Sequence, residues 1–536
     1  METLLDYIKQ HKILTILLIL FLIVVVLLIA RRRGPFHSYT LDLAQPKAEL
    51  AAEPSVLRVG VAKRDINPDF ALYDAWTDVD NNGKFDEDVD TFEDRNGNGD
   101  FDGVWMAGFS STRPATGYND PPWVRAIAYN NNGATLVMVT IDSIGIYHND
   151  YIRIRKAVDP TYPIDHITFS ATHSHELPDT MKIWSGPGIP TFGYREDYMD
   201  MVREKAVEAI QEAVDNLAPA DMYCAKVHIE PEGFVDDSRK PNVLDNNIYM
   251  MRFTKAGTEE SIATVVNWGN HPETLGGRNT LLTSDFPHYL REGVEKGVPE
   301  PNGVEGFGGM CLYFQGQVGG LMTQLHTDVP HRDGQRIFSE ASFDKAQALG
   351  ENLALVACKA LRDPAVMWKN ENPMLAIRAK TILAPLQGLF AYGIMLGMIH
   401  EGYYTGGYAK TEVNVLRIGD VVMLTIPGEI YPEIVEGGIE AKPGRDYEVE
   451  PVEVPPLRTA MEAKAKMAFI IGLANDEIGY IIPKSQWDVK EPFVYTNSEG
   501  KGTDQYGEEN SGGPDVAGVI HKESMALLSE VNATFK

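Results

Sequence analysis

The sequence predicts an α/β fold with mixed sheets flanked by helices, in a single large domain of the kind that carries a catalytic site. Short apolar runs alternate along the chain with helix-like stretches, which is typical of helices covering a sheet. Several of the apolar runs end in polar residues, and the 44% hydrophobic content of the 536 residues is ample for a packed core. No repeat of fixed period divides the chain, so we expect one large unit with insertions.

The N-terminal segment predicts a membrane anchor. After a flank at 1–12, residues 13–30 read ILTILLILFLIVVVLLIA, an uncharged run just long enough to cross a bilayer as a helix. A cleaved signal peptide is the alternative, but this run is longer than a usual signal core and meets Arg31–Arg33 without a small-residue cleavage site. We therefore expect a single-pass membrane protein in contact with the lipid bilayer, followed by a proline-containing linker at 31–54.

The orientation of this anchor depends on two opposing signals. Arg31–Arg33 after the span favour a cytoplasmic domain. Acidic loops of calcium-binding type farther along the chain favour an external location, where calcium is abundant. We expect the main domain to be extracytoplasmic, that is, periplasmic or extracellular.

The predicted domain runs from 55 to 536. Its pattern is strand-like from Ser55 to about Asp142, apart from an acidic insertion at 74–103. Apolar residues at three- and four-residue spacing predict helices at roughly 195–217, 286–297 and 343–362, and a last helix is expected near 521–531. Cys224, Cys311 and Cys358 are too far apart for a CxxC metal site and too few for a disulfide framework.

The charge of the chain excludes one class of partner. There are 76 acidic and 48 basic residues, which gives a formal net charge of −28. A nucleic-acid binder needs a basic face to offset phosphate repulsion, so we expect no nucleic-acid partner. The acidic excess suits a protein that binds cations.

Chemically capable residues follow five of the apolar runs. The runs are TLVMVTID, HITFSATHSH, ATVVNWGNH, MCLYFQGQVGG and VVMLTIPGE. Ligand sites in α/β folds are built at the carboxyl ends of strands. The sequence therefore predicts the functional site at these strand ends.

Histidines and a carboxylate at these ends are candidate metal ligands. His173 and His175 are two residues apart and share one face of an extended segment, so both can approach a cation, or one can ligate while the other contacts substrate. His271 and Glu429 add an imidazole and a carboxylate, the ligand types of catalytic zinc. The alternatives are a hydrogen-bonded histidine pair and, for Glu429, a carboxylate at a helix N-terminus.

The acidic insertion predicts two structural calcium loops. Alternating oxygen ligands and a glycine turn are typical of such loops, but position twelve is Val89 in the first and Trp105 in the second, where a glutamate is usual. Asp88, Asp90 or Glu93 could substitute, and a metal-free cluster of turns is the alternative. The expected Ca²⁺ ligands are Asp78, Asp80, Asn82 and Asp86 in the first loop and Asp94, Asn96, Asn98 and Asp102 in the second.

Taken in order, the motifs resemble those of the neutral (non-lysosomal) ceramidases, zinc amidohydrolases that cleave the N-acyl bond of ceramide. The resemblance covers roughly 55–485 through VGVAKRDINP, MAGF, RAIAYNNNGATLVMVTIDSIG, THSH, NWGNHPETLG, LLTSDFP, IPGE and NDEIGYIIP. It implies that zinc is held by His173, His271, Glu429 and Tyr480. It also implies that His175 faces the substrate or the activated water, and it matches Arg239 to the family's substrate-side arginine.

The chain departs from the family in two places. The stretch YFQGQVGGLMTQ has Met322 where the family has a serine assigned to catalysis, and methionine has no nucleophilic hydroxyl. Thr323 is adjacent, but one step along an extended segment turns its side chain to the other face. The family's immunoglobulin-like C-terminal domain is also expected to be missing, because little chain remains after Tyr480.

The expected function is that of a membrane-anchored, zinc-dependent hydrolase that cleaves an amide (N-acyl) bond of a sphingolipid-like or other lipid-like substrate. Such zinc activates a water and polarises the acyl carbonyl, so the mechanism needs no serine. Two alternatives stay open. One is a non-catalytic, metal-containing lipid-binding or surface relative, and the other is a hydrolase of an ester or lactone bond.

Overall fold

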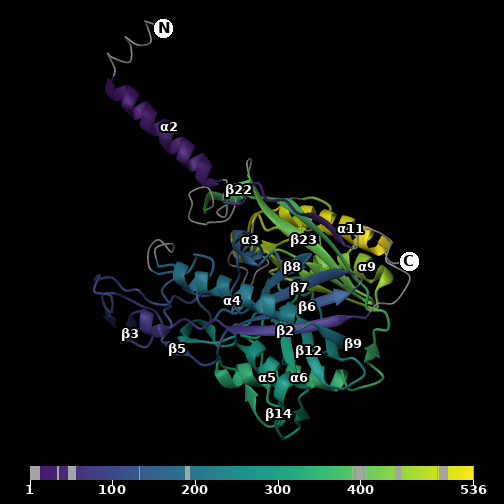
Figure 1. Cartoon of the computed structure of the whole chain (residues 1–536). Helices are drawn as coiled ribbons and strands as arrows, with labels where there is room; N and C mark the ends of the chain where they lie inside the picture. Colours follow the sequence, from purple (N-terminus) through teal and green to yellow (C-terminus); the bar gives the residue numbers. More distant parts are fainter. Residues whose placement is uncertain are drawn as a thin grey trace.

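Two β-sheets pack face to face, and helices cover the outer face of each, in the computed structural model of the chain (Figure 1). The structure describes residues 12–32, 35–45, 56–131, 133–186, 193–388, 391–393, 403–404, 407–440, 448–491, 493 and 505–534. The predicted mixed α/β fold class is confirmed.

The larger sheet has nine strands and mixes parallel with antiparallel pairs. The pairs β7–β8 and β12–β16 are parallel, and β20 (Trp368–Lys369) pairs with β9 beside the main path. The order of the other eight is β16 (Met310–Gln315), β12 (Ser261–Trp268), β11 (Asn247–Lys255), β9 (Ala218–His228), β2 (Arg58–Asp65), β6 (Trp123–Asn131), β7 (Ala134–Ile141) and β8 (His166–Ala171).

The smaller sheet has six strands. Its parallel pair is β24–β26, and β22 (Tyr403–Tyr404) pairs with β23 beside the main path. The order of the other five is β1 (Asp42–Gln45), β21 (Leu375–Pro385), β23 (Tyr408–Ile418), β24 (Val421–Thr425) and β26 (Met467–Ile471). The edge strand β1 lies within the segment predicted as a linker, so part of that segment belongs to the domain.

The main core lies between the two sheets. Side chains alternate in direction along a strand, so each sheet turns one set of apolar residues inward. Ile127 and Met138 of the larger sheet belong to the same buried cluster as Leu416 and Phe469 of the smaller one.

Helices cover both outer faces and give four layers. The helices α3 (His148–Ala157) and α4 (Glu196–Asp215) pack on one half of the nine-stranded sheet, and α5 (Phe286–Lys296) and α6 (Phe343–Ala360) pack on the other half. The six-stranded sheet is covered by α8 (Pro432–Glu436), α9 (Leu457–Met461) and α11 (Val516–Thr534) (Figure 1). The four predicted helices correspond to α4, α5, α6 and α11, and a short α10 (Tyr506–Glu509) precedes the last one.

The remaining elements are short. The 3-10 turns are Phe70–Leu72, Gly276–Arg278, Glu462–Lys464 and Lys484–Gln486. The two-stranded pairs are β3 (Ala75–Thr77) with β4 (Thr91–Glu93), β5 (Gly117–Tyr118) with β13 (Leu281–Leu282), β10 (Asp236–Asp237) with β17 (Met322–Thr323), β14 (Gly297–Val298) with β15 (Val304–Glu305), β18 (Val329–Pro330) with β19 (Ile337–Phe338), and β25 (Glu429–Ile430) with β27 (Tyr480–Ile481).

The N-terminal helix α2 (Lys12–Arg32) stands away from the body of the molecule (Figure 1). Among the described residues, no helix is both long and apolar enough to cross a membrane. The predicted anchor at 13–30 is therefore not supported, and neither is the predicted single-pass membrane location in contact with a bilayer.

Candidate metal centre and active site

The carboxyl ends of strands from both sheets meet at one place, as the sequence predicts. Ala171 at the end of β8 donates its N–H to the carbonyl of Leu473 after β26, at 3.1 Å. Gly472 donates to the carbonyl of Gln315 at the end of β16, at 2.9 Å. A Cβ on Gly472 would lie 2.3 Å from the carbonyl oxygen of Gly316, so only glycine permits this approach of the two sheets.

His173 leaves β8 in a strained backbone conformation that turns its ring toward this meeting point. Its φ is 68°, a region that non-glycine residues rarely adopt. Its N–H donates to the carbonyl of Ser143 at 2.9 Å. Its ring Nδ1 donates to the carbonyl of Ile144 at 2.6 Å, which leaves Nε2 as the free ring atom.

His271 is fixed in the same way from the loop after β12. Its Nδ1 lies 2.6 Å from the carbonyl oxygen of Met322, and its backbone N–H donates to the same oxygen at 3.1 Å. The Nε2 atom is 3.0 Å from Oε2 of Glu429. A backbone acceptor on Nδ1 is the usual arrangement around a histidine that binds metal through Nε2.

Glu429 and Tyr480 lie opposite each other on the paired strands β25 and β27. Oε2 of Glu429 is also 3.4 Å from Nε2 of His173. Burial alone would raise the pKa of Glu429, but His173 and His271 outweigh it and lower that pKa to about 2. Burial and the charge of Glu429 raise the pKa of the Tyr480 hydroxyl well above its ordinary value.

His175 completes a cluster of three imidazoles. Its ring centroid is 5.0 Å from that of His173 and 5.5 Å from that of His271. One ring nitrogen from each of the three histidines lies within 4.8 Å of the others. Burial and the two neighbouring histidines lower the pKa of His175 well below its ordinary value, so this ring is neutral.

The donor set fits a divalent metal of the zinc type. The Nε2 atoms of two imidazoles converge on one carboxylate oxygen, and imidazole nitrogen with a single carboxylate is the preferred set for catalytic zinc. Without a cation this group would bury a carboxylate whose charge only histidines offset. The predicted ligands His173, His271 and Glu429 are thus brought together, and Tyr480 lies on the strand beside Glu429.

A pocket of about 100 Å³ opens on this group. Its lining combines apolar and polar side chains. The apolar ones are Ile144, Met181, Ile183 and Trp184, the polar ones include Glu477, Tyr506 and Asn510, and the candidate site residues His173, His175, Glu429 and Tyr480 also line it.

Two acidic residues of the site were missed from the sequence. Oε2 of Glu273 lies 3.4 Å from Nδ1 of His175, and Thr323 lies beside the Glu273 carboxylate. Glu477 lines the pocket, and burial together with the charge of Glu429 raises its pKa well above its ordinary value. Both stand within three residues of a predicted ligand, a proximity that could have drawn attention to them.

The residue at the family's serine position acts through its main chain. The Met322 side chain is buried in an apolar cluster, while its carbonyl oxygen holds His271. Thr323 points the other way, as the extended segment predicts, and this direction brings it to Glu273.

Arg239 does not line the pocket. Its Nη2 donates to the carbonyl of Gln486 at 2.7 Å, and its guanidinium lies over the ring of Tyr431, 4.7 Å from the ring centroid. Glu433 and Glu508 lie within 3.9 Å of its nitrogens. A substrate-side role for Arg239 stays a prediction.

The acidic insertion brings three carboxylates together. Oxygens of Asp78, Asp80 and Asp90 lie within 4.8 Å of one another. Asp90 is one of the three residues predicted to substitute for the missing closing ligand, and its carboxylate accepts the N–H groups of Val79 and Asp86. In the second loop, Asp102 accepts from the side chains of Asn96 and Asn98, and Asp94 accepts backbone N–H groups of the loop. Calcium binding stays a prediction for both loops.

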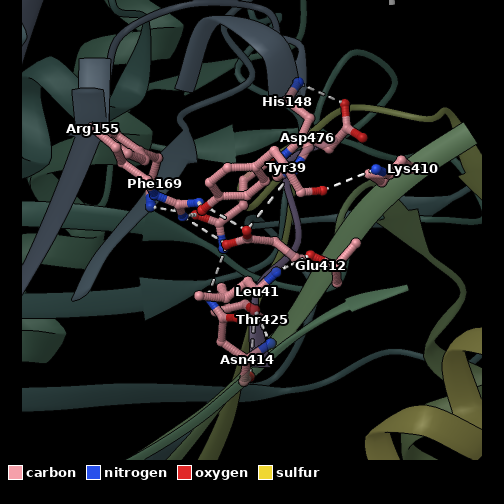
Figure 2. Close-up of polar contacts among 12 residues, drawn as sticks. Tyr39, Leu41, His148, Arg155, Phe169, Lys410, Glu412, Asn414, Thr425 and Asp476 are labelled. Carbon is pink, nitrogen blue, oxygen red and sulfur yellow. Dashed lines mark hydrogen bonds and ion pairs between the residues drawn. The ribbon is translucent and has the colours of Figure 1, made fainter. Parts of the chain in front are cut away.

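A buried polar network joins α3, β23 and the loop after β26 (Figure 2). Arg155 forms two hydrogen bonds with Glu412, at 2.8 and 2.6 Å, and a third with Oδ1 of Asn475 at 3.0 Å. The backbone N–H of His148 donates to Asp476 at 3.0 Å. The Tyr39 hydroxyl, from the N-terminal segment, lies 3.2 Å from Arg155.

Comparisons with known proteins show which family the chain resembles. Residues 96–323 match the family model "Neutral/alkaline non-lysosomal ceramidase, N-terminal". The neutral ceramidase from Pseudomonas aeruginosa has a similar structure, with a TM-score of 0.61 at 13% identity over 90% of this chain and 75% of that chain. A structure described as "Ceramidase complexed with C2" gives 0.59 at 14% identity over 89% and 75%. The search of curated protein sequences gave no match. The resemblance drawn from the motifs is confirmed, and the fold is that of the neutral ceramidases.

Proposed function

Starting from this resemblance to the neutral ceramidases, we propose that the protein is a zinc-dependent hydrolase that cleaves the N-acyl amide bond of a ceramide-like lipid substrate. One observation carries the proposal. Two imidazole Nε2 atoms and one carboxylate oxygen converge within 3.4 Å at a pocket lined in part by apolar side chains.

Each residue of the proposed site has its own role. His173, His271, Glu429 and Tyr480 hold zinc, which when bound lowers the pKa of a water and polarises the acyl carbonyl. Carbonyl acceptors on Nδ1 of His173 and His271 keep each Nε2 pointed at the same place, so the site is preorganised. His175 is neutral and beside the ligands, which suits it to take a proton from water and give it to the leaving amine.

The apolar and polar side chains that line the pocket suit the two halves of such a substrate. The acyl chain lies against Ile144, Met181 and Trp184, where it leaves water. The amine portion faces Tyr506 and Asn510, whose polar groups can bond to hydroxyls. The acyl carbonyl lies between these apolar and polar side chains, within reach of the proposed zinc ligands.

Elemental analysis and a substrate panel test the proposal together. We expect about one zinc per chain in the wild type and its loss in His271→Ala. We also expect hydrolysis of N-acyl lipids that stops with chelator and returns with added zinc. A wild-type protein that stays free of zinc in zinc-containing buffer, or turnover unaffected by chelator, would contradict it.

A non-catalytic lipid-binding relative is the second candidate, and Met322 at the serine position favours it. This candidate predicts zinc binding without turnover on any N-acyl lipid, ester or lactone in the panel. Ester or lactone turnover without amide turnover would instead assign a different bond to the same zinc site.

We also propose a structural calcium ion at Asp78, Asp80 and Asp90, consistent with an extracytoplasmic domain. Three carboxylates within 4.8 Å repel one another unless a cation lies between them. Calcium at millimolar concentration is expected to raise the melting temperature of the wild type. The same addition should leave Asp78→Asn/Asp90→Asn unchanged, and an equal response of both proteins would contradict the site.

A further inference from the structure

His175 differs from the other two histidines of the site in how its ring is held. Nδ1 of His173 and Nδ1 of His271 each lie 2.6 Å from a backbone carbonyl oxygen. Neither ring nitrogen of His175 forms a hydrogen bond of normal distance and angle among the described residues, and the backbone of Gly108 is the nearest main-chain group to the ring. The backbone of Gly108 lies against the ring, and a Cβ there would be 2.7 Å from Nδ1.

The nearest carboxylate to this ring is that of Glu273. Its Oε2 is 3.4 Å from Nδ1 of His175, and the residue is 7% exposed. Within the part of the chain that the structure describes, Glu273 has no ion pair with lysine or arginine. A separation of 3.4 Å is slightly longer than a formed hydrogen bond, and such contacts often tighten when substrate binds.

Thr323 lies beside Glu273. Burial raises the pKa of the Glu273 carboxylate, and the Thr323 hydroxyl is among the groups that lower it, while the preceding carbonyl, of Met322, holds His271. The short strand β17 therefore supports two of the three histidines, one directly and one through Glu273. The loop containing Glu273 is also tied to His175 by its backbone, because the His175 N–H donates to the carbonyl of Pro272 at 2.9 Å.

We propose that Glu273, anchored by Thr323, is the positioning residue for His175, accepting its Nδ1–H so that Nε2 faces the reacting water and leaving amine. This role rests on the proposed hydrolase function. A carboxylate behind an imidazole selects one tautomer and fixes the ring plane, as in carboxylate–histidine–metal arrangements.

A double-mutant cycle tests the coupling. Glu273→Gln is expected to lower kcat about 10- to 100-fold, the usual size of an outer-shell effect, with KM and zinc content unchanged. In a His175→Gln background the same change should cause no further loss, because Glu273 acts only through His175. Equal losses in the two backgrounds would overturn the proposal, and Glu204→Gln on the exposed face of α4 is the matched control.

Variants of Thr323 provide a second test of the proposal. Thr323→Val is expected to lower kcat in the same direction as Glu273→Gln but less, and Thr323→Ser, which keeps the hydroxyl, should restore it. A purely structural role would lower the melting temperature of Thr323→Val without a selective effect on kcat. Loss in Thr323→Ser equal to that in Thr323→Val would exclude the hydroxyl.

A measurement independent of turnover separates this inference from the proposed function. In zinc-loaded protein labelled with ¹⁵N-histidine, the His175 signal, assigned through His175→Gln, should report the Nδ1–H tautomer. Glu273→Gln should convert this signal to that of a mixture of the two tautomers. If Glu273→Gln fails to fold, Glu273→Asp replaces it in this measurement. An unchanged signal would show that Gly108 and not Glu273 fixes the ring. If no N-acyl substrate is hydrolysed, the proposed function fails while the tautomer still decides the role of Glu273.

Discussion

At the scale of single residues, the site depends on which atom of a residue faces the metal position. Met322 replaces a hydroxyl-bearing family residue, yet it contributes to the site through its carbonyl oxygen, which holds His271. Its side chain is 2% exposed and packs with apolar neighbours on the opposite side. Position 322 has therefore lost the hydroxyl of the family's serine, while its main-chain carbonyl still holds His271, the proposed metal ligand.

Restoring the family serine is expected to harm the protein. Met322→Ser removes buried apolar contacts and buries a hydroxyl, so we expect a loss of about 2–5 kcal/mol in the free energy of unfolding and no gain in kcat. Met322→Leu, which keeps the volume, should cost less than about 1.5 kcal/mol. Denaturant unfolding and initial rates measure both. A rise in kcat for Met322→Ser would show that the side chain reaches the substrate.

At the scale of elements, the loop after β26 is held in place from behind. Its residues Asn475 and Asp476 bond to Arg155 and His148 of α3, and Arg155 in turn pairs with Glu412 of β23 (Figure 2). Breaking a buried pair of this kind usually costs about 3–5 kcal/mol. The position of Tyr480 thus depends on contacts made two layers away from the pocket.

This network predicts a pH dependence of stability. Burial, with Arg155 adding to it, lowers the pKa of His166 from 6.5 to about 3. Below pH 6.5 the unfolded chain takes up a proton that the folded chain refuses, so the stability from this group is complete above pH 6.5 and is lost as the pH falls toward 3.

Replacing His166 removes that titration. The melting temperature of the wild type should fall more steeply between pH 6.5 and 3 than that of His166→Gln, which can still accept from Asn414. The carboxylates titrate equally in the two proteins and cancel in the comparison. Parallel melting curves over this range would exclude His166 as the cause.

At the scale of the whole molecule, the N-terminal segment is part of the sandwich. Strand β1 adds an edge to the six-stranded sheet, and the Tyr39 carbonyl accepts a hydrogen bond from Lys410 at 2.9 Å. The Leu41 N–H donates to Thr381 at 2.7 Å. These contacts cover polar groups that would otherwise face water or stay unpaired.

Two truncations separate the helix α2 from this segment. Deleting 1–34 leaves β1 and its contacts intact and should not change the melting temperature of the domain. Deleting 1–45 removes β1 and the partners of Lys410, so we expect a clearly lower melting temperature. Calorimetry on the two proteins measures the difference, and equal values would show that β1 adds no stability.

The sequence by itself determined the features that depend on neighbouring residues and on residue types. The apolar spacing predicted α4, α5, α6 and α11 because helix periodicity is a property of neighbouring residues. The strand-end pattern and the family motifs predicted that His173, His271 and Glu429 form one group, and the structure brings the three together. The match over 96–323 confirms that resemblance.

Only the tertiary structure decided which distant residues meet. It brought Glu273 to His175 and Thr323, and it turned the Met322 side chain to the core and its carbonyl to His271. It also placed part of the predicted linker in a sheet. These outcomes depend on how two sheets pack against each other, and contacts between distant segments leave no periodic signal in the chain.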